Sequence, residues 1–350
     1  MKEHDRQPTA QPSRIHSRTE FDFIKKLRDI VSPSEQSSVA VGIGDDGAVI
    51  QSQAGREIVV STDLLVEDVD FRRTSTTPSL LGRKALAVSL SDVAAMGARP
   101  RWALTSIGVP ENIWETNFVN EFYDGLLALA GQYDVQLIGG DTSSTPEQIV
   151  VDSIVMGECA AGGAIKRGGA KAGDQIFVTG YLGGAAAGLR LIERGAHLPG
   201  EASDDLHLVD HVMLRQLRPE PRVGWGIVLG QERMATAMID ISDGLSSDLH
   251  HLCAESRVGA LVDSSLLPID KKVVDLCGRR ALDPLQLALH GGEDFELLFT
   301  VSPGNVSRLP RRVDGVSITR VGEIKAASEG IKISEGSRVW ALEPGGWTHF

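Results

Sequence analysis

Acidic residues next to glycine or serine recur in six short motifs between Asp45 and Asp294, and these motifs carry the side chains best suited to chemistry. The motifs are GIGDDGAVI (42–50), STDLL (61–65), SLSDVAAMG (89–97), IGGDTS (138–143), IDISDGLSSDL (239–249) and GGEDFELLF (291–299). A Mg²⁺ ion that also binds phosphate takes only one or two protein carboxylates, keeps several waters and requires nearly octahedral oxygen ligands. If the six turns converge in the fold, their carboxylates would form a multi-metal site for phosphate groups.

The charge of the chain limits the classes of ligand. Asp and Glu number 47 against 35 Lys and Arg, which gives a formal net charge of −12. An acidic surface repels nucleic acid and anionic membranes, so neither is an expected partner. Phosphorylated substrates would be repelled as well, unless bound Mg²⁺ reverses the local charge.

Length and composition predict a cytoplasmic protein of two domains. A chain of 350 residues with 42% hydrophobic residues can bury two cores of ordinary size. Cys159, Cys253 and Cys277 form no CxxC pair and no metal-finger spacing, so we expect reduced, buried thiols. The N-terminus lacks the apolar core of a signal peptide, and no run approaches the ~20 apolar residues of a membrane span.

The pattern of apolar residues divides the chain into a tail and two domains. Residues 1–18 are polar and are expected to be disordered, the first domain covers 19–158 and the second covers 159–350. One predicted helix begins at Thr19, and the others cover 79–97, 118–133, 185–195 and 245–252. The predicted strands cover 39–43, 48–50, 57–61, the buried run QLIGG (136–140), 149–158 and 175–179.

The segment GIGDDG (42–47) matches the glycine pattern of dinucleotide-binding folds, but that interpretation is rejected. The pattern requires a helix after the glycines, whereas the β-like AVI follows here. Asp45 and Asp46 would also repel a phosphate that no metal shields. The structural alternative is a hairpin turn with Asp-Gly chemistry. No GxxxxGK[ST] motif and no kinase HRD or DFG motif occurs.

The remaining acidic motifs each have a structural alternative. Residues 61–63 (STD) stand at the end of a predicted strand, where all three side-chain oxygens could face one ligand or form a turn. Asp92 either caps a helix or projects into a cleft, and Asp141 follows a buried strand, where ligand-facing residues are common. These alternatives do not explain why the same chemistry recurs six times.

Two motifs of the second half join a strand to a turn. Asp240 and Asp243 flank Ser242 before a helix, which places carboxylates and free backbone N–H groups together. Glu293 and Asp294 follow a Gly-Gly turn, for which entry into a strand is the alternative.

Taken together, the motifs resemble thiamine-monophosphate kinase, a family of the ATP-binding superfamily that includes aminoimidazole ribonucleotide synthetase. The resemblance runs from TEFDFI near residue 19 to GGWTHF at 345–350, with GIGDD, STD, KALAVSLSDVAAMGA, LIGGDT, IDISDGLSSDL and GGEDFEL in this order. It implies an α+β fold of two domains. The N-terminal α/β domain would bind ATP and Mg²⁺ and form a homodimer, and the C-terminal α+β domain would complete the active-site cleft.

The resemblance also implies the reaction. ATP would donate its γ-phosphoryl group to thiamine monophosphate, giving thiamine diphosphate and ADP, with several Mg²⁺ ions per site and a need for K⁺ left open. The acceptor phosphate is already anionic and needs no protein nucleophile, so positioning and Mg²⁺ would provide most of the catalysis.

Three groups of site residues follow from the resemblance, position by position. The implied Mg²⁺ ligands are Asp46, Ser61, Thr62, Asp63, Asp92, Asp141, Asp240 and Asp243. The implied nucleotide contacts are Tyr123, Gly140, Asp141, Arg167 and Ser242. Arg167 is also a candidate for stabilising charge during transfer. The implied substrate contacts are Glu293 and Trp347, whose indole offers a face to a cationic thiazolium.

One position departs from the family pattern. A histidine usually precedes phenylalanine after the STD segment, whereas this chain reads VEDVDF and has Asp70 there. The resemblance places that residue at the phosphorylated substrate. An aspartate cannot donate to phosphate unless it is protonated or bridged by a metal, so affinity or substrate choice would change. Alternatively, a cation or another side chain covers the loss.

Two other functions remain as alternatives. A related ATP-dependent enzyme could act on another acceptor, but selenophosphate synthetases carry a reactive residue near the N-terminus and this chain has no cysteine before Cys159. The hydrogenase-maturation relative ends in cysteine, where this chain has Phe350. A non-catalytic nucleotide sensor is the second alternative, and Asp70 is the only hint of it.

Overall fold

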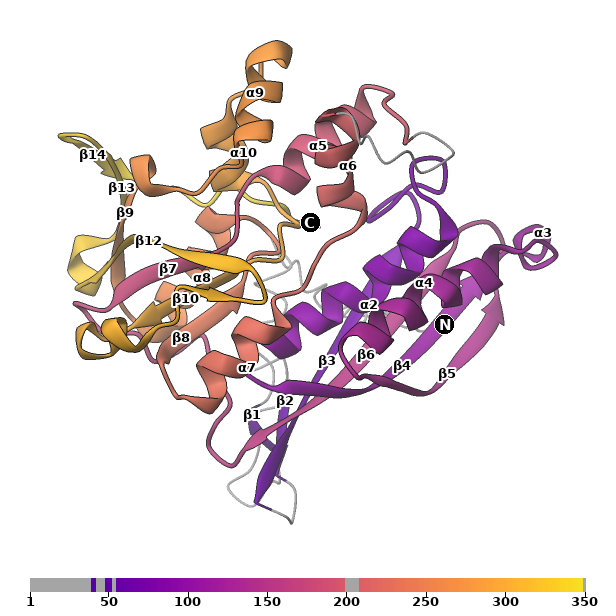
Figure 1. The fold of residues 1–350 in the computed structure, drawn as a ribbon, viewed down its shortest axis with the longest axis horizontal. Helices are drawn as coiled ribbons and strands as arrows, with labels where there is room; N and C mark the ends of the chain where they lie inside the picture. Colours follow the sequence, from indigo (N-terminus) through magenta and orange to yellow (C-terminus); the bar gives the residue numbers. More distant parts are fainter. Residues whose placement is uncertain (1–38, 42–47, 52–54, 199–207, 349–350) are drawn as a thin grey trace, which may run out of the picture.

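The computed structural model describes residues 39–41, 48–51, 55–198 and 208–348, whose strands form one sheet in each half of the chain (Figure 1). The first half contains β1 (Val39–Val41), β2 (Ala48–Gln51), β3 (Arg56–Val66), α2 (Pro78–Ala95), β4 (Arg99–Val109), α3 (Glu111–Trp114), α4 (Phe118–Gln132), β5 (Gln136–Ser144) and β6 (Val150–Ala160). The second half contains β7 (Gln175–Thr179), α5 (Gly184–Glu193), α6 (Leu208–Leu217), α7 (Val223–Gln231), β8 (Ala235–Asp240), α8 (Leu245–Ser256), β9 (Gly259–Asp263), α9 (Lys271–Arg280), α10 (Pro284–His290), β10 (Leu297–Val301), β11 (Arg312–Val313), β12 (Val316–Lys325), β13 (Ile331–Glu335) and β14 (Arg338–Ala341).

The first sheet has helices on one face and a partly exposed opposite face. Its strands follow the order β1-β2-β3-β6-β4-β5, in which β4 and β5 are parallel and the other neighbours are antiparallel. α2 and α4 pack against each other and lie across one face of the sheet (Figure 1). β6 alternates strictly between buried and partly exposed residues, because successive side chains of a strand point to opposite faces. We call the face away from α2 and α4 the open face.

α2 is buried on most of its surface because it packs against both halves. The hydroxyl of Thr77 accepts the backbone N–H of Leu80 at 3.2 Å and Pro78 follows it, which begins the helix. Small residues let the neighbours approach closely: a Cβ atom at Gly82 would stand 1.8 Å from the carbonyl oxygen of Phe122 in α4. α2 also contacts α7 and β8 of the second half.

The second sheet is covered on both faces. Its strands follow the order β14-β13-β9-β12-β7-β10-β8, with β11 paired to β12, and β9 and β13 are its parallel pair. Leu245, Leu249 and Leu252 of α8 are fully buried against one face, as their spacing predicts. On the other face, Trp225 of α7 and Phe299 of β10 pack in one cluster with Ala95 at the end of α2. The core of the second half is therefore continuous with the main helix of the first.

Most predicted elements are confirmed, with one clear error. α2, α4 and β7 correspond to the predicted helices at 79–97 and 118–133 and to the predicted strand at 175–179. The prediction of a buried strand at 136–140 is wrong, because β5 is an edge strand that is exposed along almost its whole length. A short apolar run ending in two glycines does not reveal whether a strand has neighbours on both sides.

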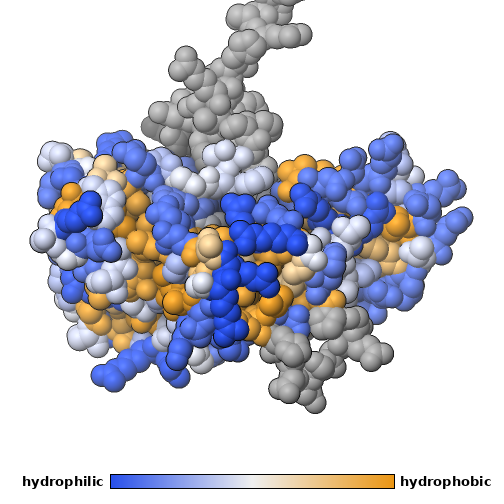
Figure 2. Space-filling model, turned by 90° about the horizontal axis from the view of Figure 1, so that it is seen from above, coloured by the Kyte–Doolittle hydropathy of each residue, from blue (hydrophilic) through white to orange (hydrophobic). Residues whose placement is uncertain are grey.

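Some expectations stay untested. The tail at 1–18, the helix from Thr19 and the hairpin at 42–47 lie outside the described residues. The first sheet ends at Ala160 and the second begins at Gln175, so the domain boundary at 158/159 stays a prediction. Within the described ranges, no helix has the length and apolar character needed to cross a lipid bilayer. Figure 2 shows hydrophilic residues over most of the upper side of the molecule, with hydrophobic patches between them.

Candidate functional site

A short segment of α2 joins the acidic strand motifs of both halves. Ser89 Oγ lies 2.6 Å from Asp63 Oδ2 of β3, and Ser91 Oγ donates to Asp240 Oδ2 of β8 at 2.6 Å. The hydroxyl of Ser61 donates to Asp92, one residue after Ser91. The STD, SLSD and IDISD motifs therefore meet in space, with Asp240 only 2% exposed. Serine hydroxyls orient three of the predicted Mg²⁺ ligands.

The expectation that the side chains of residues 61–63 face one ligand is wrong. β3 continues to Val66, so its alternation turns Thr62 away from Ser61 and Asp63. Thr62 Oγ1 donates instead to Asp152 Oδ1 of β6 at 2.6 Å, on the open face. The sheet thus separates the hydroxyl of Thr62 from the carboxylates of Asp63 and Asp92.

Gly140 and Asp141 lie on the edge strand of the same sheet. Asp141 is opposite Ser106 of β4, which in turn is opposite Asp152 of β6, so the three share one row of the sheet. Asp141 Oδ1 accepts the N–H of Thr142 at 2.8 Å. Gly140 has a φ of 158°, and a Cβ atom there would stand 1.9 Å from the carbonyl oxygen of Thr105. Only glycine allows this close approach of β5 to β4.

Three loops of the second half are joined through their backbones. The N–H of Glu293 donates to the carbonyl of Ser242 at 2.7 Å, and the N–H of Trp347 donates to the carbonyl of Asp243 at 3.1 Å. The N–H of Gly346 also donates to Ser247 Oγ at 3.0 Å. The ISDG, GGED and GGW segments, far apart in the sequence, therefore form one wall, on which Trp347 is 52% exposed.

Glu293 is held from both halves of the protein. Lys84 Nζ of α2 lies 2.7 Å from Glu293 Oε1, and the side-chain amide of Gln216 in α6 donates to Glu293 Oε2. Glu293 has a φ of 64°, in the left-handed region that non-glycine residues rarely adopt. Sequence reasoning missed both partners. Lys84 stands in the KALAVSLSD run, seven residues before Ser91, and helical spacing alone indicates that the two share a face.

Carboxylates crowd the start of α8. Asp248 is 2% exposed and accepts the N–H groups of Gly244 at 3.0 Å and Asp243 at 3.2 Å. Burial, and then the charges of Asp243 and Asp240, raise the pKa of Asp248 well above its usual range. The Gly244 bond and the charge of Arg167 act in the opposite direction. The charge of Arg167 therefore acts on this cluster, and its role in phosphate transfer stays a prediction.

A second carboxylate pair supports the GGED loop. Asp294 accepts the N–H groups of Gly183 at 2.5 Å and Ala185 at 3.0 Å, and burial raises its pKa to about 6. Burial alone would also raise the pKa of Glu296, but Arg222 and Arg215 lower it below its usual value. Sequence reasoning missed Glu296, because the arginines that pair with it lie about 75 residues away.

Tyr123 and Asp70 contact other parts of the fold. Tyr123 of α4 packs on the first core, with its ring edge-on to Phe122 at 5.4 Å. Asp70 Oδ2 accepts the N–H of Val66 at 2.8 Å and so closes the turn after β3. Asp46 lies outside the described residues.

The donor set fits Mg²⁺ of the kind that phosphate transfer uses. The carboxylates of Asp63, Asp92, Asp240 and Asp243 would provide oxygen ligands, and burial together with the charges of Asp243 and Asp240 raises the pKa of Asp248. Considering only the described ranges, no group of three or more His, Cys, Asp or Glu side chains is arranged to hold a metal by itself. A Mg²⁺ ion that takes one or two carboxylates and completes its shell with water and phosphate is consistent with this arrangement.

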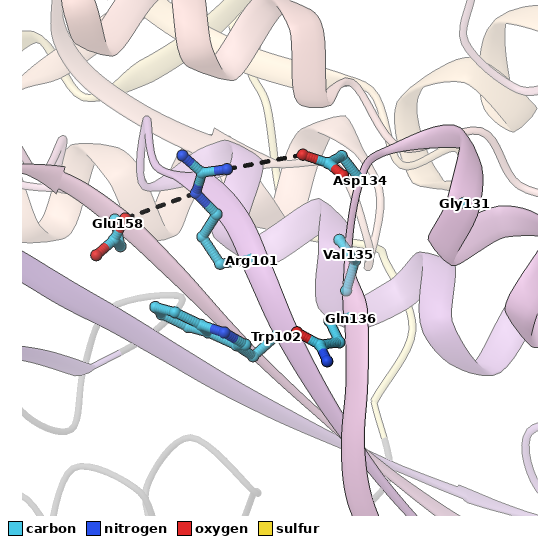
Figure 3. Close-up of a pocket in the computed structure, with 7 residues that line it drawn as sticks. All are labelled: Arg101, Trp102, Gly131, Asp134, Val135, Gln136 and Glu158. Atoms are coloured by element: carbon cyan, nitrogen blue, oxygen red, sulfur yellow. Dashed lines mark ion pairs between the residues drawn. The ribbon is translucent and has the colours of Figure 1, made fainter.

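A shallow cavity lies elsewhere on the first half. Its volume is about 630 Å³, and its lining residues are Arg101, Trp102, Gly131, Asp134, Val135, Gln136 and Glu158 (Figure 3). Arg101 lies between Glu158 at 3.5 Å and Asp134 at 3.8 Å. Ser106 comes five positions after Arg101 along β4, which is about 17 Å in an extended strand. The cavity contains none of the predicted site residues and is not the site.

Both halves match models of known domains. The AIR synthase related protein, N-terminal domain, matches residues 44–159, and the AIR synthase related protein, C-terminal domain, matches residues 171–333. The α+β fold and the acidic site at the junction of the halves thus define a two-domain protein of the AIR synthase related class.

Relatives of known name narrow the class. The thiamine-monophosphate kinase of Bacillus subtilis (strain 168) is 37% identical over 336 residues, which are 95% of this chain and 99% of the relative. The solved structure of AaThiL complexed with AMPPCP and TMP is 31% identical, has a TM-score of 0.82 and covers 97% of this chain and 100% of its own. Thiamine-monophosphate kinase from Stenotrophomonas maltophilia K279a is 38% identical, with a TM-score of 0.72 and coverage of 89% and 95%. This chain belongs to the thiamine-monophosphate kinase family.

Proposed function

We propose that this chain phosphorylates thiamine monophosphate to thiamine diphosphate with ATP as the phosphoryl donor. The observation that supports this most strongly is the convergence of the acidic motifs of both halves on residues 89–92 of α2. The similarity to AaThiL, solved with AMPPCP and TMP, extends over 97% of this chain and supports the same two ligands here. The enzyme would be a phosphotransferase with a phosphate group as acceptor.

The donor half of the site would surround the transferring phosphoryl group. Asp63, Asp92, Asp240 and Asp243 would hold Mg²⁺, which when bound neutralises phosphate charge. The hydroxyls of Ser89 and Ser91 fix the carboxylates of Asp63 and Asp240, so these groups need little reorganisation when nucleotide arrives. The charge of Arg167 acts on Asp248, and we propose that this residue stabilises phosphate oxygens. Ser242 and the edge-strand residues Gly140 and Asp141 are proposed as nucleotide contacts.

The acceptor half would lie on the wall formed by the GGED and GGW segments. Trp347 is half exposed and would present its indole to a cationic thiazolium, and the side chain of Glu293, on the same wall, is 29% exposed. The acceptor phosphate attacks as an anion, so the chain needs to orient it rather than to activate it. Asp70 is engaged with its own turn, so we do not assign it to the substrate.

We further propose a homodimer formed through the open face of the first sheet. Leu64 of β3 is 59% exposed and Ile138 of the edge strand β5 is 49% exposed. Exposed apolar residues gathered on a sheet face are a usual place for contact with another chain. A cytoplasmic location is also proposed, since Cys159, Cys253 and Cys277 are buried free thiols.

The experiment that tests the function is chromatographic detection of thiamine diphosphate. Purified protein is incubated with ATP, Mg²⁺ and thiamine monophosphate, and free thiamine serves as a parallel acceptor. Product from the monophosphate alone would support the kinase. Absence of product from either acceptor, with ATP still bound, would favour another acceptor or a nucleotide sensor.

A further inference from the structure

Glu293 is the one predicted acceptor contact whose carboxylate is fixed on both oxygens. Lys84 lies 2.7 Å from Oε1 and Gln216 donates to Oε2. The backbone of Glu293 is in the left-handed region, where a non-glycine residue persists only if its surroundings hold it. The two side-chain partners come from α2 and α6, so this residue is held by elements of both halves.

Lys84 is an unusual partner because its side chain is only 5% exposed. Lysine is almost never buried so deeply unless it is paired, since removing an ammonium from water costs several kcal/mol. An ion pair between two exposed side chains would contribute little to stability. Here the ammonium of Lys84 is buried, whereas the carboxylate that it pairs with remains 29% exposed. The exposed part of the Glu293 side chain is thus accessible to a ligand, while Lys84 and Gln216 fix its orientation.

α2 also sets the distance between the two halves of the site. Ser91 follows Lys84 by seven residues, which is two helical turns on one face and about 10 Å along the axis. Ser91 binds Asp240 on the donor side, and Lys84 binds Glu293 on the acceptor side. One rigid helix therefore positions a donor-side and an acceptor-side carboxylate of the second half.

We propose that Lys84, with Gln216, is a positioning residue that presets the carboxylate of Glu293 for the cationic acceptor. This rests on the proposed function, because the acceptor is thiamine monophosphate. Lys84 acts through Glu293 and touches no reacting atom. A preset carboxylate loses less rotamer freedom when the acceptor binds, which increases affinity for the acceptor and leaves the nucleotide site unchanged.

The test measures binding of thiamine monophosphate by calorimetry, with AMPPCP and Mg²⁺ present, for the wild-type chain and Lys84→Met. We expect the Kd of thiamine monophosphate to rise about threefold to tenfold, because a Glu293 side chain without Lys84 loses more rotamer freedom when the acceptor binds. The Kd of AMPPCP should change less than twofold, and Lys84→Arg should recover most of the affinity. Lys325→Met is the matched control. It also removes a paired lysine, whose Nζ lies 2.6 Å from Glu323 Oε1, but this pair is not part of the proposed site.

Two further measurements separate positioning from a purely structural role. The double variant Lys84→Met, Glu293→Gln should bind the acceptor no more weakly than Glu293→Gln alone. The reason is that each change removes the same ion pair between Lys84 and Glu293. Equal losses for AMPPCP and acceptor, or additive effects in the double variant, would overturn the proposal. Product formation by the wild-type chain reports separately on the proposed function. A wild-type chain that binds the acceptor but makes no product would refute the kinase and leave the test of Lys84 valid.

Discussion

At the scale of single residues, Asp63 and Asp240 each interact with a serine of α2 and face the junction of the two halves. Asparagine keeps the size of the side chain and one acceptor oxygen but removes the negative charge. We expect Asp63→Asn and Asp240→Asn each to lower kcat at least about a hundredfold, because binding of Mg²⁺ at the transferring group is lost. The measurement is turnover across a Mg²⁺ titration, with the melting temperature recorded for each variant.

Asp134→Asn is the matched control for these variants. Its side chain is 94% exposed at the shallow cavity, so turnover should stay at the wild-type level. Near-normal turnover of both site variants at low Mg²⁺ would contradict the multi-metal site.

Asp70 illustrates how a local contact can replace an expected functional one. Its carboxylate accepts the N–H of Val66 at 2.8 Å and closes the turn after β3. Asp70→Ala should lower the free energy of unfolding by about 1 kcal/mol, as loss of one such bond does, and change the KM of thiamine monophosphate less than threefold. Urea denaturation and steady-state kinetics measure the two quantities. A tenfold rise in KM would return Asp70 to the substrate.

The sequence indicated which acidic residues gather, but not how they are held. Asp63, Asp92 and Asp240 were predicted because their motifs repeat the same chemistry and resemble one family. Ser89 and Ser91 stand inside a predicted motif, yet their bonds depend on how α2 crosses both sheets. Gln216 left no signal at all, since an amide on an amphipathic helix is ordinary until tertiary contacts bring Glu293 to it.

At the scale of elements, the crossing of α2 and α4 depends on glycines that have no room for a side chain. A Cβ atom at Gly125 would stand 1.9 Å from the carbonyl oxygen of Ser79, whereas one at Gly131, near the end of the same helix, would meet nothing within 4 Å. Gly125→Ala should therefore lower the free energy of unfolding by at least about 2 kcal/mol, because the helices must separate.

Gly131→Ala, in the same helix α4, should instead raise the free energy of unfolding. Alanine favours the helix, so we expect a gain of about 0.5 kcal/mol. Urea denaturation of both variants measures the difference in sign. Two variants of equal stability would contradict the close helix contact.

The start of α5 should give the protein a measurable pH dependence. Asp294 is buried there, and its pKa of about 6 is above the value of about 3.9 expected in the unfolded chain. Between these values the folded state binds the extra proton, so the stability that Asp294 contributes is greatest at low pH and falls as pH rises towards about 6. Above that pH its contribution is level.

Asp294→Asn tests this dependence because asparagine does not titrate. From pH 5 to pH 7, the free energy of unfolding of the wild type should fall by about 1 kcal/mol relative to the variant. Urea denaturation at both pH values gives the comparison. A parallel pH dependence in the two proteins would show that the pKa of Asp294 is not raised.

Helices and strands are predicted best where the apolar residues keep a regular spacing over a long segment. They are predicted worst where the prediction depends on whether a strand is buried or exposed. The apolar spacing of residues 118–133 was enough to predict α4. The run at 136–140 predicts a buried strand, yet among the described strands β5 pairs with β4 alone, and it is exposed. Alternation along β3 likewise placed Thr62 opposite its neighbours, because the strand extends beyond the turn that the motif suggested.

At the scale of the whole molecule, the open face of the first sheet should determine the oligomeric state. Light scattering should give twice the chain mass of 37.5 kDa for the wild type. Leu64→Glu places a charge on that face and should shift the mass to that of one chain. Leu266→Glu, at a side chain that is 45% exposed in the second half, should leave the dimer intact. A wild-type mass of one chain would refute the dimer.

Chain length and the pattern of apolar residues predict two domains, and the family resemblance implies their α+β class. Neither predicts that Ala95 joins the cluster of Trp225 and Phe299 across the boundary. Contacts of this kind depend on how two cores are oriented, which no local period encodes.

The double attachment of α2 constrains how the halves can move. Ser91 binds Asp240 and Lys84 binds Glu293, and both side chains lie on one face of α2. If the second half slid along α2, both contacts would break at the same time. The two contacts, about 10 Å apart along α2, therefore keep the donor-side and acceptor-side carboxylates at a constant spacing.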